Sequence, residues 1–131
     1  MIELEKAREL LAKAVETQGR SFVYNPDGAY WCQYTPQISY ADSPVAKTGC
    51  LIGVALDLAG ETRHHEGDNS QVGVVTLYNR YPDMMTYTAV LYFNAAQHKQ
   101  DGGWSWGEAH DYAESDVERI EDDALRMADV Y

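Results

Sequence analysis

The sequence lacks the long apolar run that a membrane-spanning helix requires. No stretch of its 131 residues approaches about 18 consecutive apolar side chains. The amino terminus, from Met1 to Lys6, is charged and amphipathic, and it has neither the basic start nor the apolar segment of a secretory signal. We therefore expect a cytoplasmic protein that has no membrane partner.

Cysteine is scarce, with only Cys32 and Cys50 in the chain. In a reducing cytosol both are expected to be thiols. Cys50 follows a glycine at the start of a predicted helix, where the helix dipole favours a thiolate. It is therefore the candidate nucleophile of a small cysteine-dependent hydrolase or transferase, with His64 or His65 as the base. The alternatives are a small apolar core residue and a Cys32–Cys50 disulfide.

Motifs that bind metals, nucleotides or acyl groups are missing as well. Cys32, Cys50, His64 and His65 are of the residue types that bind zinc, but no C-x-x-C or H-E-x-x-H spacing is present. The sequence contains no Walker loop and no G-x-G-x-x-G loop for binding phosphate, and it contains no G-x-S-x-G nucleophile motif. The sequence therefore predicts no metal and no cofactor, and it favours a non-enzymatic function over an enzymatic one.

Basic residues are few, ten against 21 acidic residues, so the formal net charge is −11. The excess is greatest at residues 101–131, which contain ten acids and two arginines. Such a chain repels the phosphate backbone of nucleic acids, so direct nucleic-acid binding is not expected. The same charge suits a basic protein partner, including inhibition of a nucleic-acid-binding enzyme by mimicry of its substrate.

Apolar residues recur at three-and-four spacing over three segments, which predicts amphipathic helices. These helices cover residues 3–18, 50–59 and about 86–99. Gly19 and Gly60 follow the first two helices, and glycine is the usual residue after a helix end because it tolerates a positive φ. The middle helix is apolar nearly all round, so we expect it to be buried.

The acidic end, about 105–131, is expected to form two further helices. Ser-x-x-Glu capping boxes begin at Ser105 and Ser115 and predict helices over 105–114 and 116–130. The last helix has a narrow apolar stripe, so one face can dock on the core while the other faces solvent. The solvent-facing candidates for binding a basic partner are Glu118, Glu121, Asp122 and Asp123.

Runs of β-branched and aromatic residues predict a small antiparallel sheet. Two runs flank the turn sequence 25–28, Asn-Pro-Asp-Gly, and predict a hairpin at about 21–34. A valine-rich run predicts a third strand at about 71–78, after a polar loop at 61–70. The expected fold is therefore α+β, a single domain of residues 1–131 in which the sheet packs against four or five helices.

Aromatic residues are abundant, with ten tyrosines and three tryptophans. Tyr30, Trp31 and Tyr34 lie close together in the expected hairpin. Tyrosine and tryptophan provide large contact areas at low entropic cost, so they are frequent in binding surfaces. Core packing is the alternative interpretation. Together with the acidic helix, these three residues are the candidate contacts for a protein partner, and homo-oligomerisation is left open.

Two stretches carry a resemblance to a family. These are Gly49–Gly60, Gly-Cys-Leu-Ile-Gly-Val-Ala-Leu-Asp-Leu-Ala-Gly, and Ala95–Ala109, which contains Gln-Asp-Gly-Gly-Trp-Ser-Trp-Gly-Glu-Ala. With the segments around Phe22 and Gln33, they resemble small proteins of actinobacteria and their phages that have no established activity. The resemblance implies a phage or mobile-element accessory factor. We therefore expect a non-enzymatic, acidic interaction protein that binds or inhibits a host protein.

Overall fold

Helices make up the regular secondary structure of the part of the chain that the structure describes. The computed structural model describes residues 1–24, 33–35 and 49–130. Among these residues the β-type pairing is limited to one isolated parallel bridge, between Ile2 and Met85. The elements in chain order are α1 (Leu4–Gln18), α2 (Leu51–Leu58), the 3-10 helices η1 (Arg63–His65) and η2 (Gly67–Gln71), α3 (Val74–Arg80), α4 (Tyr87–Asp101), α5 (Trp106–Ser115) and α6 (Val117–Val130).

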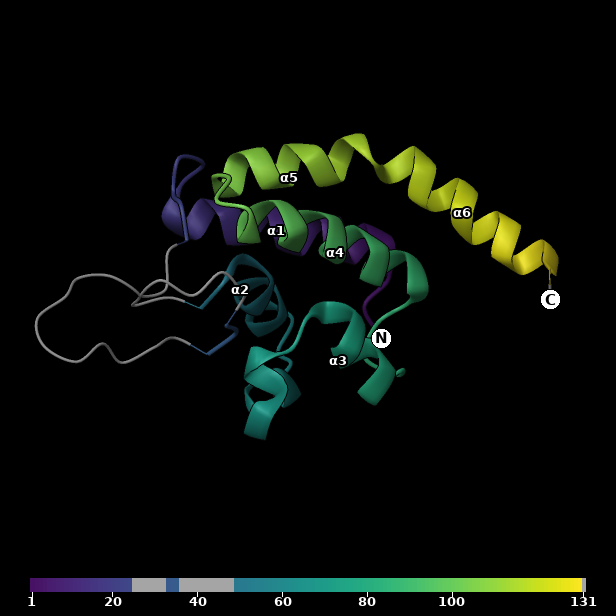
Figure 1. The fold of residues 1–131 in the computed structure, drawn as a ribbon, viewed down its shortest axis with the longest axis horizontal. Coiled ribbons are helices and arrows are strands. Elements are labelled where there is room, and N and C mark those ends of the chain that lie inside the picture. The colour runs from purple at the N-terminus through teal and green to yellow at the C-terminus, as the bar shows by residue number, and fades with distance from the viewer. Residues whose placement is uncertain (25–32, 36–48, 131) are drawn as a thin grey trace, which may run out of the picture.

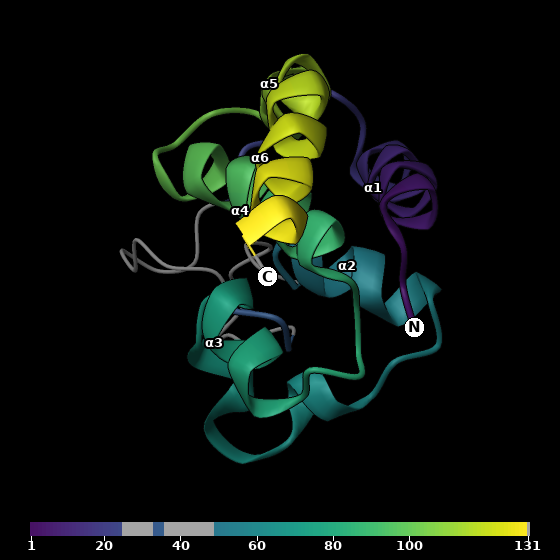
Figure 2. The same cartoon turned by 90° about the vertical axis from the view of Figure 1, so that its right-hand side faces the viewer.

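Helix α4 is the central element, and it contacts α1, α2, α3, α5 and α6. In Figure 1, α5 lies above α1 and α4, and α6 continues from α5 past the rest of the molecule. Figure 2 shows α4 near the middle of the end-on view. Its buried residues cover most of its circumference, as expected for a helix surrounded by others. They are Ala89, Val90, Tyr92, Phe93, Ala95, Ala96, Gln97 and Gln100.

The spacing of apolar residues located α1, α2 and α4 correctly. Helices α1 and α2 match the segments predicted at 3–18 and 50–59. Helix α4 begins after Thr86, whose side chain accepts a hydrogen bond from the backbone N–H of Ala89. No helix among the described residues is long and apolar enough to cross a bilayer.

One of the two predicted capping boxes forms. At the start of α5, Ser105 and Glu108 each accept a hydrogen bond from the other's backbone N–H. The second box is wrong in detail, because the hydroxyl of Ser115 donates to the carbonyl of Tyr112 instead. Asp116 nevertheless separates α5 from α6, so the break between the two C-terminal helices lies where the sequence predicted it.

The predicted antiparallel sheet is wrong. Residues 21–24 and 33–34 are the described ends of the expected hairpin, and they form no strand. The residues between them, 25–32, lie outside the described residues. The expected third strand, 71–78, covers the end of η2 and most of α3. The described part of the chain is therefore an all-α fold and not an α+β fold.

The valine-rich segment is helical because its apolar residues fit a helix when they are counted at three-and-four spacing. Val74 and Leu77 are buried, and Tyr78 and Tyr81 pack against the core on the same side. Preference for a strand is a weak, context-dependent effect of about 1 kcal/mol, and packing on α4 outweighs it. The run of β-branched residues misled the prediction because it is too short to distinguish the two periods.

Two buried glutamines of α4 supply the N-terminal caps that α2 and α3 lack. The side-chain oxygen of Gln100 accepts from the backbone N–H of Leu51 at 2.8 Å, and that of Gln97 accepts from Val74 at 3.0 Å. Neither helix has a side-chain cap from its own N-cap residue. Buried N–H groups without partners are costly, so these two bonds fix where α2 and α3 begin against α4.

The backbone of Tyr34 lies directly against α2, at a glycine. A Cβ atom added to Gly53 would lie 2.7 Å from the Cα atom of Tyr34, well inside van der Waals contact. The backbone N–H of Tyr34 donates to Ser70, and that of Cys50 donates to Gln33. The segment 33–35 is thereby held between α2 and η2.

We expect Gly53→Ala to destabilise the protein. Helix propensity alone predicts a gain of about 1 kcal/mol for alanine in a helix interior, whereas the clash with the backbone of Tyr34 predicts a loss of about 1–3 kcal/mol. Urea unfolding followed by circular dichroism measures the sign of the change in the free energy of unfolding. Leu58→Ala, at an exposed position of the same helix, should change the free energy of unfolding by less than about 1 kcal/mol. A Gly53→Ala variant more stable than the wild type would contradict the close contact between α2 and the backbone of Tyr34.

Asp101, at the end of α4, is a half-buried carboxylate whose pKa burial raises to about 6. The pKa in the folded state exceeds that of the unfolded chain, so protonated Asp101 favours folding below about pH 4, and this contribution is lost as the pH rises through about 6. Asp101→Asn should therefore raise the free energy of unfolding at pH 8 by about 1 kcal/mol, with no gain at pH 4. Asp122→Asn, at an exposed site, serves as the control. If Asp101→Asn changed the free energy of unfolding equally at both pH values, the raised pKa of Asp101 would be contradicted.

Candidate metal centre

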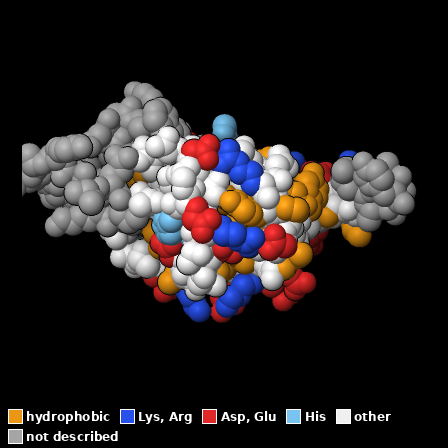
Figure 3. Space-filling model, turned by 90° about the horizontal axis from the view of Figure 1, so that it is seen from below, with side chains coloured by type: hydrophobic (Ala, Val, Ile, Leu, Met, Phe, Trp, Pro, Cys, Tyr) orange, Lys and Arg blue, Asp and Glu red, His pale blue; other side chains and the backbone are white. Residues whose placement is uncertain are grey.

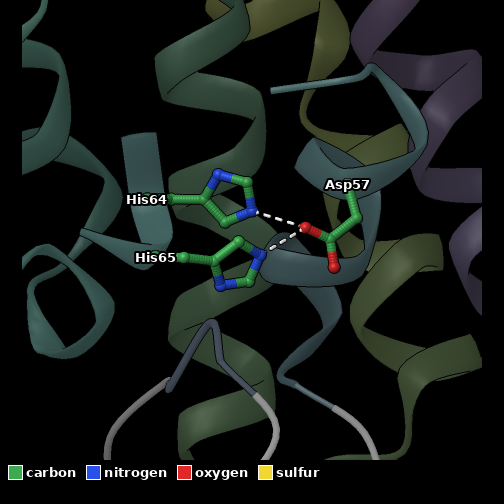
Figure 4. A group of neighbouring side chains, drawn as sticks. All are labelled: Asp57, His64 and His65. Atoms are coloured by element: carbon green, nitrogen blue, oxygen red, sulfur yellow. Dashed lines mark hydrogen bonds and ion pairs between the residues drawn. The ribbon is translucent and has the colours of Figure 1, made fainter. Parts of the chain in front are cut away.

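Asp57, His64 and His65 form a cluster in which two imidazoles meet one carboxylate. Nε2 of His64 lies 2.7 Å from Oδ1 of Asp57, and Nε2 of His65 lies 2.6 Å from the same oxygen. Figure 4 shows both rings extending from η1 toward the carboxylate on α2. One ligand atom from each residue lies within 4.8 Å of the other two. Three potential metal-ligand atoms therefore lie close together.

The cluster lies at the boundary between core and solvent. The side chain of His64 is 0% exposed, whereas those of His65 and Asp57 are 30% and 44% exposed. Burial lowers the pKa of His64, although its hydrogen bond to Asp57 acts in the opposite direction. The lowered pKa favours the neutral form of His64, which is the form of imidazole that binds a metal.

Aromatic packing orients the two imidazoles. The ring of Tyr34 meets that of His64 edge-on, with centroids 5.8 Å apart, and the rings of His64 and His65 lie 4.0 Å apart. The hydroxyl of Thr35 is 2.8 Å from Nδ1 of His65. A hydrogen bond to the second ring nitrogen fixes the orientation and tautomer of a histidine ligand. The segment 33–35 thus orients both histidines.

An ion-pair and amide network holds η1 in place. The guanidinium of Arg63 donates to both carboxylate oxygens of Glu61, at 3.0 and 3.1 Å, and also to Asp83. The side-chain amide of Asn69 donates to the carbonyl of Arg63 and to the hydroxyl of Tyr81. Figure 3 shows the mixture of acidic and basic side chains on the lower face of the molecule. The short helix that carries both histidines is therefore anchored on each side.

This arrangement supports two kinds of chemistry. Without a metal, each Nε2–H donates to Asp57, and the cluster joins the end of α2 to η1 by two hydrogen bonds. A tetrahedral zinc ion bonded at about 2.1 Å places two of its ligands about 3.4 Å apart. The observed separations of 2.7 and 2.6 Å are shorter. The half-exposed Asp57 side chain therefore has to move outward to admit an ion.

Cys50, the candidate nucleophile of the alternative enzymatic interpretation, is not placed for that role. It is buried and disulfide-bonded in this structure, so it is not the thiol that the sequence predicted. The chain's other cysteine, Cys32, lies outside the described residues. Cys50 precedes the first residue of α2 and Asp57 lies near its last, about 10 Å away along the helix axis. The structure therefore does not bring Cys50 together with His64 and His65.

The predicted binding residues fall into three groups. Tyr34 is buried in the core instead of exposed on a surface, and its hydroxyl accepts from the side-chain amide of Gln97. Tyr30 and Trp31 lie outside the described residues. On α6 the acids Glu118, Glu121 and Asp122 are exposed, and Asp123 pairs with Arg119.

Sequence reasoning missed Asp57 and Thr35 as members of the cluster. Asp57 did leave a signal, because it is the one charged residue in an otherwise apolar helix. A charged side chain there must lie on an exposed edge or find a partner, and the first basic residues that follow it in the sequence are Arg63, His64 and His65. Thr35 left no comparable signal, since it precedes a proline in an irregular segment.

The chain has no detectable relatives among characterised proteins. No protein-family model matches it, and neither the curated proteins nor the solved structures provide a match. The resemblance to small proteins of actinobacteria and their phages therefore stays a prediction. The functional argument rests on the geometry of Asp57, His64 and His65.

Proposed function

We propose that this protein binds a divalent transition-metal ion through Asp57, His64 and His65. The observation that carries the proposal is the convergence of two Nε2 atoms on one carboxylate oxygen, at 2.7 and 2.6 Å. Two imidazoles and one carboxylate form a ligand set that suits zinc, iron(II) and their first-row neighbours. Calcium and magnesium prefer oxygen ligands, so the set disfavours them.

The surroundings of the cluster support metal binding in two ways. Burial lowers the pKa of His64, which disfavours the charged imidazolium, a form that cannot bind a metal. Thr35 provides the hydrogen-bond partner that a histidine ligand needs at its second ring nitrogen, 2.8 Å from His65. The ligands also come from two separate elements, α2 and η1, so a bound ion would link them and stabilise the fold.

Zinc titration of the full chain tests the proposal. Isothermal titration calorimetry should show one ion per chain, and Zn²⁺ should raise the melting temperature because it binds the folded state. Asp57→Ala and His65→Ala change partly exposed side chains, so both variants should fold. Each should weaken binding at least about tenfold, since each removes one of three ligands.

His98→Ala is the matched control, because His98 is an exposed histidine on α4 outside the cluster. It should bind Zn²⁺ as the wild type does. Equal affinity of the wild type, Asp57→Ala and His65→Ala would contradict the proposed site, and so would a wild type that binds no ion.

A second candidate function is recognition of a basic protein by α6. The observation that favours it is the exposure of Glu118, Glu121 and Asp122, which form no ion pair among the described residues. Figure 1 shows α6 extending past the other helices, so one side of it is accessible. Long-range attraction from such a face speeds association with a cationic surface and weakens as salt is added.

Neutralising three acids of α6 tests this second function. We expect Glu121→Gln, Asp122→Asn and Asp123→Asn together to slow association with a short oligolysine peptide about three- to tenfold at low salt, with folding unchanged. Stopped-flow fluorescence measures the on-rate. The control neutralises three exposed acids, Glu3 at the N-cap of α1 and Glu5 and Glu16 within it, which removes equal charge elsewhere. Equal slowing of both variants would show that only net charge matters.

The cytoplasmic location expected from the sequence stays a prediction. The disulfide at Cys50 weighs against it, because disulfides persist mainly in oxidising compartments.

A further inference from the structure

We infer that a metal ion held by Asp57, His64 and His65 keeps coordination positions open on its exposed side and takes a small anion there, such as a carboxylate. This inference rests on the proposed function and adds the ligand class to it. Its three supports are the number of protein ligands, the direction from which solvent reaches the cluster, and the charge that the bound ion would carry.

The protein offers fewer ligands than a closed metal site needs. The cluster holds three ligand residues, and no other histidine, cysteine or carboxylate among the described residues belongs to it. Structural zinc sites have four protein ligands, whereas sites that bind an external molecule have three and leave a position free. Iron(II) and cobalt(II) with two histidines and one carboxylate likewise keep positions open.

Glu66 and Glu61 are the acidic residues nearest to the two histidines in sequence. Glu66 is exposed and is not part of the cluster, and Glu61 already forms an ion pair with Arg63. Both of its carboxylate oxygens accept hydrogen bonds from the guanidinium of Arg63. The hydrogen bonds from Arg63 lower the pKa of Glu61 to about 2. Moving Glu61 to a metal would break a bidentate pair that also holds η1 in place, so a fourth ligand is more easily supplied from outside the protein.

The open positions face solvent because burial across the cluster is uneven. His64 is 0% exposed and closes the inner side under the ring of Tyr34. Asp57 and His65, at 44% and 30% exposed, form the outer side. A molecule can therefore reach the ion past these two residues without any rearrangement of the core.

The charge of the bound ion selects an anion. A divalent ion with one carboxylate ligand and two neutral imidazoles carries a residual charge of about +1. The guanidinium of Arg63, the residue before His64, is neutralised by Glu61 and Asp83, so the ion is the cationic centre of the site. An anion of single charge would neutralise it, whereas a neutral molecule of the same shape would not.

Visible absorption of the cobalt-loaded protein tests the inference, because the d–d bands of Co²⁺ report its ligands. Azide should change these bands with saturation at one site while the cobalt remains bound, as checked by metal analysis after gel filtration. Acetate should produce a similar change at a concentration at least about tenfold lower than acetamide, its neutral counterpart of the same shape. His98→Ala should respond to azide and acetate as the wild type does.

Each outcome separates the two proposals. Bound cobalt with a spectrum that azide does not alter would overturn the open site and leave metal binding intact. Equal effects of acetate and acetamide would overturn the preference for anions, and loss of cobalt on adding azide would overturn a stable ternary complex. A protein that binds no cobalt would refute the proposed function itself.

Discussion

The arrangement of this fold depends on two buried amide side chains, Gln97 and Gln100, on the central helix. Each accepts a hydrogen bond from the first turn of a shorter helix, α3 and α2 respectively. Helices of seven and eight residues are marginal on their own, and their first N–H groups would be unsatisfied in an apolar core. The glutamines therefore define where both short helices begin, and the direction of α2 in turn sets the position of Asp57.

The second constraint is the close contact between α2 and the segment 33–35. Gly53 leaves room for the backbone of Tyr34, so this segment can pass directly beside the helix. The side chain of Tyr34 then covers His64, and the next residue, Thr35, reaches His65. A larger residue in place of Gly53 would push away the same segment that orients both histidines. Packing in the core and geometry at the cluster are thus linked through one glycine.

Sequence reasoning recovered the helices whose signals are local and missed the features that depend on tertiary contacts. The apolar spacing at 3–18 and the Ser105–Glu108 box were sufficient because a helix and its cap are encoded within a few residues. Helix α3 was misread because its start depends on Gln97, 23 residues away from Val74. Of the cluster, the sequence indicated His64 and His65 as candidate site residues but not Asp57. No spacing rule joins the end of one helix to a 3-10 turn that follows it.

The same three residues can serve as a hydrogen-bond network or as metal ligands, and the difference lies in where two protons reside. In the network each Nε2 carries a proton and donates a hydrogen bond to Asp57. A metal binds an unprotonated nitrogen, so for a metal to bind Nε2 the proton of the neutral ring must be on Nδ1 instead. For His65 the hydroxyl of Thr35 can accept a hydrogen bond from Nδ1–H. For His64, Nδ1 is buried and has no hydrogen-bond partner among the described residues. The free energy that opposes metal binding is therefore concentrated at His64, whereas His65 can change tautomer and keep both of its contacts.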